Sequence, residues 1–527
     1  MAEHLASVPE ETATGFTPRN TYRDWIRTVP VSGAPIAWGL PNSQRHHTGS
    51  SYSSSLASIS CPSNSNYTDS SDRTVAVFTA LAGSDELSKI AHQMVRDGYT
   101  RRMVQAVNVS EANTEPALRY SGDDNDSALE SWFVELDVDW VLQIRNKHGS
   151  WPDLQLQDKS ASSLQDLVQK WIRALTVIVL SITELILVSS PNERPSVEFF
   201  GKVSIAKMLV FLETIIPALK AENLRALLDM YICVSGSSYM FSDFSIAANP
   251  REDPSFCLET RGSANYLSCE ATRLNVAISR AMEKMQTLID EDGDWASDIT
   301  RGRGEVHRNT RRMMECILSM REACASTQNS VPDGNTMTLP SLIDHTIDYL
   351  KDVLLRKSEL CSNLSLRYLF LLNNLYFVSQ VLSEPSVLLD YVVSPLQFSS
   401  LIITPECVKY LDRYLDVSWR HLMSTLDCEP NLDFCGPLNH WMWIKSSLAK
   451  FKLAKFEAAL HKTYKAQKFW RVPDPSLRGA LRRTIVKEVI GRYNYYIEHH
   501  PEIVEHVSDG NSSPDALEKM LRELFEG

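Results

Sequence analysis

Residues 445–492 read KSSLAKFKLAKFEAALHKTYKAQKFWRVPDPSLRGALRRTIVKEVIGR. Eight Lys and five Arg stand here against three acidic residues, a net charge of +10 in a chain whose total is −12. The basic charge is therefore concentrated in one place, although an acidic protein needs no such patch for solubility. A patch of this kind usually meets an anion: phospholipid headgroups, nucleic acid or the acidic face of a partner.

Two amphipathic helices are predicted within this stretch. Apolar residues recur at helical spacing along one side of each, and Asp474-Pro475 in the connecting turn supplies a capping side chain followed by Pro at the first helical position. The predicted buried positions are Ala449, Leu453, Phe456, Leu460 and Tyr464 in the first helix and Leu477, Leu481, Ile485, Val489, Tyr493 and Tyr496 in the second. Each helix is thus expected to bury one face and expose the other.

Basic residues occupy the exposed sides of both predicted helices. The candidate lipid-binding residues are Lys450, Lys455, Lys462, Lys465 and Lys468 on the first helix and Arg482, Arg483 and Lys487 on the second. A single such helix most often only exposes its lysines to solvent, but two adjacent helices are expected to combine their basic faces into one surface. Each Lys or Arg beside an anionic leaflet contributes about 1 kcal/mol to the free energy of binding. A few such residues therefore bind a membrane only weakly, unless several copies of the protein or other binding modules act together.

The rest of the chain predicts an all-α fold. Helical periodicity begins at Ser84, Gly is scarce at 20 residues, and no alternating strand pattern or fixed repeat is visible. Helices are expected near 84–107, 127–147, 162–189, 197–219, 221–238, 264–292, 304–326, 340–363, 366–383, 405–425, 437–470, 476–499 and 514–526. Consecutive helices with short links pack as antiparallel neighbours, so the predicted architecture is an elongated rod of stacked helical bundles.

Four regions are predicted along the chain, because 527 residues exceed the size of a single hydrophobic core. They are a mostly disordered Ser/Thr/Asn-rich segment at 1–83, helical bundles at 84–250 and 251–425, and a C-terminal bundle at 426–527 that carries the basic surface. Disorder is expected above all in Asn42–Ser71, whose composition cannot bury enough apolar surface to offset its ordering entropy.

Several features bear on the compartment. The ten Cys are scattered without a C-x-x-C pair, as expected of free thiols in a reducing environment. The N-terminal residues MAEHLASVPEETATG lack the basic and apolar regions of a signal peptide, so secretion is not expected. Ala174–Val188 is shorter than the roughly 20 residues that span a bilayer and contains Glu184, so it is predicted to be a core helix.

The sequence contains no complete catalytic or metal-binding motif. Gly302–Gly304 begins like a phosphate-binding loop but lacks the third Gly and the Lys-Ser/Thr pair, so a helix-entry loop is expected there. The His pairs at 46–47 and 499–500, with His506 nearby, have no fixed carboxylate or thiolate partners. We therefore expect no enzyme activity, no cofactor and no metal, and the pI of about 5.6 argues against nucleic acid as a partner.

Several motifs carry a family resemblance. They are LDMY at 228–231, VHRNTR at 306–311, LLNN at 371–374, RTIVKE at 483–488, LFEG at 524–527, and the phrases KIAHQMVRDGYTRRMVQA at 89–106 and LESWFVELDVDWVLQI at 129–144. Through them, residues 84–527 resemble the exocyst seventy-kilodalton subunit family (Exo-seventy), in its plant branch. Asn373 and Asn374 also have a plain physical interpretation: amides inside an apolar helix are expected to hydrogen-bond neighbouring helices or backbone groups.

The resemblance implies a function. Members of the family are vesicle-tethering subunits with a cullin-repeat-like helical rod, and they bind phosphatidylinositol bisphosphate through basic residues of the C-terminal bundle. The matching positions here are Arg483 and Lys487, with the lysines of 450–468 beside them. The implied partners are other exocyst subunits, an anionic phosphoinositide membrane and small GTPases. The implied location is cytoplasmic, peripheral at the plasma membrane, where the protein would act in exocytosis.

One departure keeps a second interpretation open. Family members have a longer helical N-terminal region, whereas the residues before Ser84 are few and polar, which weakens the expectation of stable assembly into the exocyst. The alternative is an exocyst-independent, membrane-associated adaptor or immune-related interaction protein, a partner of immune receptors or a target of pathogen effectors. An enzyme is the least favoured third class.

Overall fold

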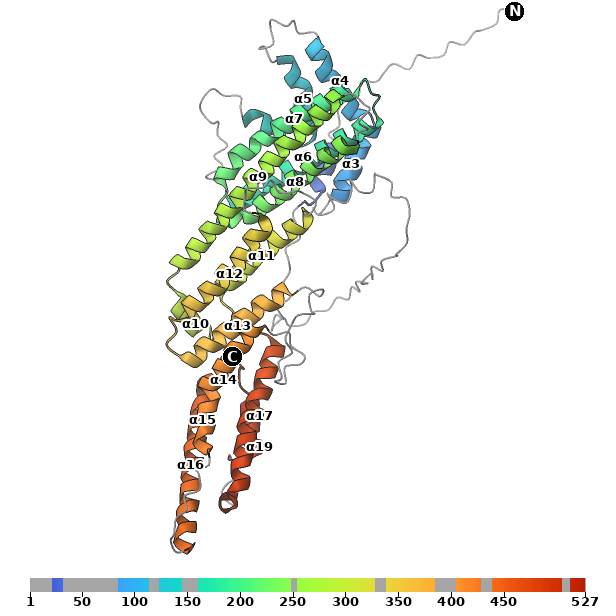
Figure 1. The fold of residues 1–527 in the computed structure, drawn as a ribbon. Coiled ribbons are helices and arrows are strands. Elements are labelled where there is room, and N and C mark those ends of the chain that lie inside the picture. Colours follow the sequence, from blue (N-terminus) through green and yellow to red (C-terminus); the bar gives the residue numbers. More distant parts are fainter. Residues whose placement is uncertain are drawn as a thin grey trace, which may run out of the picture. The chain divides into compact units, whose positions relative to one another are not determined.

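The computed structural model describes residues 21–31, 84–112, 123–144, 160–247, 254–327, 338–383, 404–427, 438–504 and 512–526. Every regular element within these ranges is a helix, so the predicted all-α class is confirmed (Figure 1). The chain divides into two compact units, Met1–Met282 with Ser319–Leu339 and Glu283–Leu318 with Pro340–Gly527. The four regions expected from the sequence remain predictions.

The helices of the first unit are α1 (Thr21–Thr28), α3 (Ser84–Arg96), α4 (Tyr99–Ala112), α5 (Asp123–Glu135), η1 (Asp139–Ile144), α6 (Ala161–Val188), α7 (Arg194–Ile215), η3 (Ile216–Ala218), η4 (Ala221–Asn223) and α8 (Leu224–Ala247). The helices of the second unit are α10 (Trp295–Arg301), α13 (Leu364–Leu382), α14 (Pro405–Leu415), η6 (Asp416–Arg420), α15 (His421–Met423), η7 (Ser424–Leu426), α16 (Leu438–Gln467), α17 (Pro475–His499), η8 (Pro501–Ile503) and α19 (Pro514–Arg522). Three helices contain residues of both units: α9 (Pro254–Glu291), α11 (Arg308–Ser326) and α12 (Leu339–Ser358).

Helix α6 is the core helix of the first unit. Among the described residues it alone is long and apolar enough to cross a membrane, yet 72% of its most apolar window is buried within the protein. It packs against α3, α7 and α8, and the indole N–H of Trp171 donates to the carbonyl oxygen of Met208 at 2.8 Å. This burial supports the prediction that Ala174–Val188 belongs to a core helix.

Helix α1 was not predicted; it lies inside residues 1–83, which the sequence analysis expected to be mostly disordered. Its Ile26 is buried, and its backbone N–H at Tyr22 donates to a carboxylate oxygen of Glu135 at 2.8 Å. Arg23 and Arg27 both donate to the Asp137 carboxylate. Eight residues give too short a periodic pattern to detect, and these hydrogen bonds come from residues over 100 positions away. Asn42–Ser71 lies outside the described residues.

Other predicted helices have different bounds because the backbone turns within them. The helix expected at 84–107 is divided into α3 and α4 at Gly98, whose φ of 69° is in the left-handed region that glycine accepts readily. The helix expected at 127–147 ends with α5, and Asp137 with φ 63° precedes η1. Helix α10 was not predicted, because seven residues again give little periodicity.

A pair of buried amides joins three parts of the second unit. Asn374 of α13 accepts hydrogen bonds at Oδ1 from the backbone N–H of His307 (2.9 Å) and from the hydroxyl of Thr310 (2.7 Å). Its neighbour Asn373 donates through Nδ2 to the carbonyl oxygens of Gly304 (2.6 Å) and Arg471 (2.9 Å). The expectation that these amides bond neighbouring segments is confirmed. They tie the entrance of α11 and the turn before α17 to one helix.

The loop between α10 and α11 packs closely against α13 at Gly304. Gly304 has φ 84°, and a Cβ placed there would lie 3.3 Å from a methyl group of Leu366. The ring of His307 stacks on that of Trp295, with 3.9 Å between centroids. Residues 302–304 thus form the helix-entry loop that the sequence predicted, with glycine required at 304 by both conformation and packing.

We expect Asn374→Ala to lower the free energy of unfolding by roughly 2–4 kcal/mol. The substitution leaves a buried N–H and a buried hydroxyl without their shared acceptor and opens a small cavity. Denaturant titration followed by circular dichroism measures the change. Asn494→Ala on the exposed side of α17 is the control and should stay within about 0.5 kcal/mol of the parent. Equal effects of the two substitutions would contradict the role given to Asn374.

Candidate membrane-binding surface

Helices α16 and α17 pack through their apolar stripes. The rings of Phe456 and Tyr493 stack with 5.7 Å between centroids, and the hydroxyl of Tyr496 donates to the carbonyl oxygen of Ala449 at 3.2 Å. All the predicted stripe positions are buried except Tyr464, which is half-buried. The expected pair of amphipathic helices is therefore present, with the start of α16 beside the end of α17.

The turn into α17 is built as the sequence predicts. The side chain of Asp474 accepts from the backbone N–H of Leu477 at 2.7 Å, and Pro475 occupies the first turn. The backbone carbonyl of Arg471 is held by Asn373, as described above. These contacts set where α17 begins, and therefore where its basic side chains emerge.

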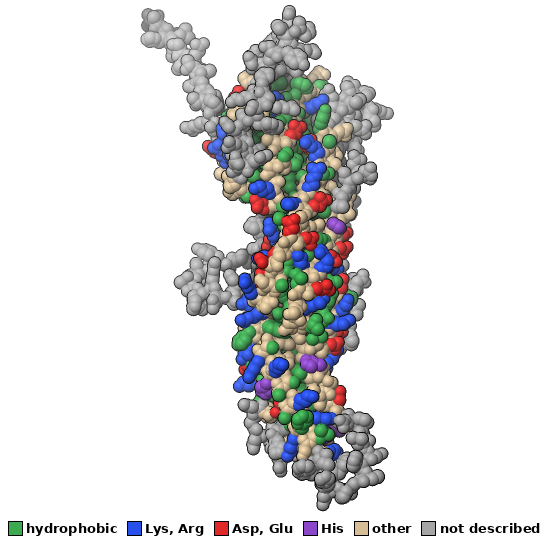
Figure 2. All heavy atoms as spheres, turned by 90° about the vertical axis from the view of Figure 1, so that its left-hand side faces the viewer, with side chains coloured by type: hydrophobic (Ala, Val, Ile, Leu, Met, Phe, Trp, Pro, Cys, Tyr) green, Lys and Arg blue, Asp and Glu red, His purple; other side chains and the backbone are tan. Residues whose placement is uncertain are grey.

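Six of the eight candidate lipid-binding residues are exposed. These are Lys450, Lys455, Lys462, Lys465, Arg483 and Lys487. Their side chains form no hydrogen bond or ion pair with another described residue. Such cations keep their full charge available to an anion that arrives from solution. On the face that Figure 2 shows, Lys and Arg side chains lie between acidic and apolar ones.

The exposed cations form two faces, one on each helix. Helical spacing places Lys455, Lys462 and Lys465 opposite the apolar stripe of α16, and Arg483 and Lys487 opposite that of α17. The Phe456 and Tyr493 rings of the two stripes contact each other, and each helix carries its cations on the side away from its own stripe. The expectation of one combined surface stays a prediction, and we call the two sets of residues the α16 face and the α17 face.

Lys468 and Arg482 differ from the other candidates because they make internal contacts. The Lys468 ammonium lies 2.9 Å from a carboxylate oxygen of Glu523, and the Arg482 guanidinium donates to the carbonyl oxygen of Leu524 at 2.6 Å. Hydrogen bonding to Tyr464 and then to Glu523 raises the pKa of Lys468, whereas burial lowers the pKa of Arg482. Both side chains hold the C-terminal segment, in which Phe525 is buried.

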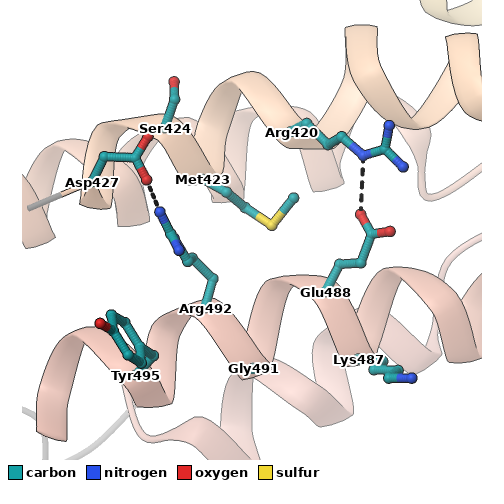
Figure 3. A pocket seen from close by; sticks show the side chains of 9 residues that line it. All are labelled: Arg420, Met423, Ser424, Asp427, Lys487, Glu488, Gly491, Arg492 and Tyr495. Atoms are coloured by element: carbon teal, nitrogen blue, oxygen red, sulfur yellow. Dashed lines mark hydrogen bonds and ion pairs between the residues drawn. The ribbon is translucent and has the colours of Figure 1, made fainter.

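A shallow groove of about 500 Å³ lies beside the α17 face (Figure 3). It runs between α17 and the segment from η6 to η7, with Gly491 on the α17 side. Arg420 pairs with Glu488 at 3.6 Å and Arg492 pairs with Asp427, so two of its three cations are neutralised locally.

Lys487 lines the same groove but points away from both ion pairs in Figure 3. It is the cation of the groove that has no acidic partner among the described residues. Sequence analysis missed Arg420 here because it lies 67 positions before Lys487 in the sequence. Only the packing of α15 and η7 against α17 brings the two residues into one groove.

Other candidate sites can be placed as well. Among the described residues, no group of three or more His, Cys, Asp or Glu is arranged to hold a metal ion. His499 contacts the carbonyl oxygen of Tyr495, and His500 packs on the ring of Tyr496. The His pair at 46–47 and His506 lie outside the described residues. Cys233 is a buried free thiol whose pKa burial raises to about 12, so it is unreactive at neutral pH.

The fold and this surface define an all-α helical-bundle protein with exposed cations near its C-terminus. Residues 169–523, more than half of the chain, match the family described as the C-terminal part of the Exo70 component of the exocyst complex. The chain belongs to this family, as the sequence motifs predicted.

Individual relatives agree with the family assignment. Exocyst complex component EXO70A3 of Arabidopsis thaliana is 23% identical over 280 residues, which are 50% of this chain and 46% of the relative. EXO70A1 of the same plant is 22% identical over 289 residues, 51% of this chain and 43% of the relative. Both are plant proteins, in line with the predicted plant branch, and the chain matches less than half the length of each.

A solved structure of S. cerevisiae Exo70 also aligns with this chain. The alignment covers 86% of this chain and 97% of the yeast chain, with a TM-score of 0.33 and 13% sequence identity.

We expect Arg482→Ala to loosen the C-terminal segment without unfolding α17. The substitution removes the guanidinium that holds the Leu524 carbonyl, so backbone amides of residues 523–526 should exchange with solvent about tenfold faster, a cost near 1–2 kcal/mol. Hydrogen exchange read by mass spectrometry measures this. Arg483→Ala, one residue away on the exposed side, is the matched control. Faster exchange in the control, or none in Arg482→Ala, would contradict the structural role.

Proposed function

We propose that this chain is an exocyst-subunit-like vesicle-tethering protein that binds anionic phosphoinositides at the plasma membrane. Membership of the Exo70 family supports tethering. The observation that carries the membrane contact is the set of six exposed cations on α16 and α17 that have no acidic partner among the described residues. Arg483 and Lys487 are the central candidates because they lie in the family motif and face away from the core.

The contact is weak because few charges contribute to it. Two cations on the α17 face contribute about 2 kcal/mol at an anionic leaflet, and a few more on the α16 face bring the sum to several kcal/mol. Affinity on this scale is roughly millimolar, so a single molecule dissociates quickly. Tethering then requires several membrane-binding modules in one assembly, which is what an exocyst subunit would have.

The proposed partners follow from the same assignment. They are other exocyst subunits, small GTPases and a phosphoinositide-bearing membrane, and the proposed location is cytoplasmic and peripheral at the plasma membrane. The proposed role is non-enzymatic, needs no cofactor and does not involve nucleic acid. The protein would bind to the membrane and dissociate from it without catalysing a reaction.

A second candidate function is an exocyst-independent adaptor at the membrane, including a role with immune receptors or pathogen effectors. It is kept because the relatives share at most 46% of their own length with this chain, so contacts made by their other parts are not carried over. The α16 and α17 faces would serve such an adaptor equally well.

Charge reversal tests the membrane contact. Arg483→Glu with Lys487→Glu should lower binding to vesicles that contain phosphatidylinositol bisphosphate by at least tenfold, since two attractions become two repulsions. Co-sedimentation at about 0.1 M salt, where charges still act over roughly 10 Å, measures it. Lys202→Glu with Lys207→Glu, two exposed lysines of α7, makes the same change in net charge elsewhere and should bind as the parent does. Unchanged binding in the α17 variant would refute the contact.

Affinity purification from plant cells separates the two functions. A tethering subunit should recover the other exocyst subunits in comparable amounts, whereas an independent adaptor should recover none of them. The Arg483→Glu/Lys487→Glu variant is the useful control, because loss of membrane contact alone should leave soluble assembly intact. Absence of every exocyst subunit from both preparations would favour the adaptor.

A further inference from the structure

The α16 face carries two large apolar side chains among its lysines. Phe451 is 66% exposed, the largest exposed fraction among the exposed large hydrophobic residues of the described chain, and Leu448 is 43% exposed. By helical spacing Phe451 lies opposite the buried stripe of α16, so no change of rotamer takes it into the core. Exposed phenylalanine at this level raises the free energy of the protein in water unless something covers it.

The charged side chains that α16 itself exposes beside Phe451 and Leu448 are all basic. Glu457 is the single acidic residue of α16, and its carboxylate accepts from the Tyr493 hydroxyl at 3.2 Å, on the seam side of the helix. The α16 face therefore offers Phe451 and Leu448 together with exposed lysines and no carboxylate of its own helix. Apolar side chains framed by lysines are typical of helices that lie in the interface of an anionic membrane.

We propose that Phe451 and Leu448 insert among the lipids of an anionic bilayer when the protein docks, with the α16 helix lying along the surface. This inference rests on the proposed membrane contact and adds an apolar component to it. Phe451 and Lys462 are eleven residues apart, about 17 Å along the helix, so the apolar pair and the far lysines meet the same surface. The lysine side chains extend back to the phosphates while the aromatic ring enters the acyl boundary.

The cations favour a lipid surface over a protein partner. All the basic residues of α16 apart from its histidines are Lys, and none is Arg. Lys is a flexible point charge that suits mobile phosphates, whereas protein interfaces are enriched in Arg and depleted in Lys. An acidic protein with an apolar groove is the competing occupant, and the experiment below separates the two.

The test compares Leu448→Ser/Phe451→Ser with the parent on phosphatidylserine and phosphatidylinositol bisphosphate vesicles at low and high salt. We expect about a tenfold loss of affinity at low salt, because partial burial of two apolar side chains is removed. At about 0.5 M salt, where charge attraction is screened, the parent should keep residual binding that this variant lacks. Tyr266→Ser on α9 removes an aromatic side chain of similar exposure, 63%, and should bind as the parent does.

The two proposals fail in different ways. If Leu448→Ser/Phe451→Ser binds like the parent at both salt concentrations while Arg483→Glu/Lys487→Glu loses binding, insertion is refuted and the electrostatic contact stands. If the serine variant keeps vesicle binding but no longer recovers a protein partner from cells, the α16 face is a protein interface and insertion is again refuted.

A second measurement is independent of affinity. Phe451→Trp introduces an indole whose fluorescence reports its surroundings. On vesicles, the variant should show additional fluorescence at shorter wavelength than the parent does, and lipids with a quencher on their acyl chains should reduce this additional signal. An unshifted, unquenched signal on bound vesicles overturns insertion. Matching circular dichroism of the parent and all variants establishes that the substitutions leave the fold intact.

Discussion

The second unit depends on the hydrogen bonds of two adjacent buried amides. Asn373 and Asn374 satisfy backbone groups of two loops, one entering α11 and one entering α17, and buried polar groups of this kind are costly to leave unpaired. Because α13 holds both loops, the positions of the α17 cations follow from these bonds. A polar pair in an apolar helix thus decides where a surface many residues away is presented.

The basic residues of the C-terminal helices divide into two kinds by what surrounds them. Lys468 and Arg482 are engaged by Glu523 and by the Leu524 carbonyl, and they stabilise the chain end. The cations of the α16 and α17 faces meet no acidic residue that the structure describes, so their attraction remains available to lipid phosphates. Within one stretch of sequence, Lys468 and Arg482 therefore stabilise the fold, while other basic residues remain exposed for binding.

Much of the fold was predictable because helices leave local signals. Spacing identified the buried stripes of α16 and α17, and Asp474-Pro475 marked the start of the second. Short elements held by distant contacts were missed: α1 depends on Asp137 and Glu135, and α10 has only seven residues. Of the candidate site, the exposed cations were predicted, whereas Arg420 in the groove and the internal roles of Lys468 and Arg482 were not.

By itself the sequence determined that the chain is all-α, that its family is Exo70, and which side of each C-terminal helix is apolar, because these depend on local periodicity and motifs. Only the tertiary structure decided that the two apolar stripes meet, through the stacked rings of Phe456 and Tyr493. It also decided which cations are neutralised, since Glu523 and Glu305 reach Lys468 and Arg471 from distant positions. Charge in a sequence becomes an available charge only when folding leaves it without a partner.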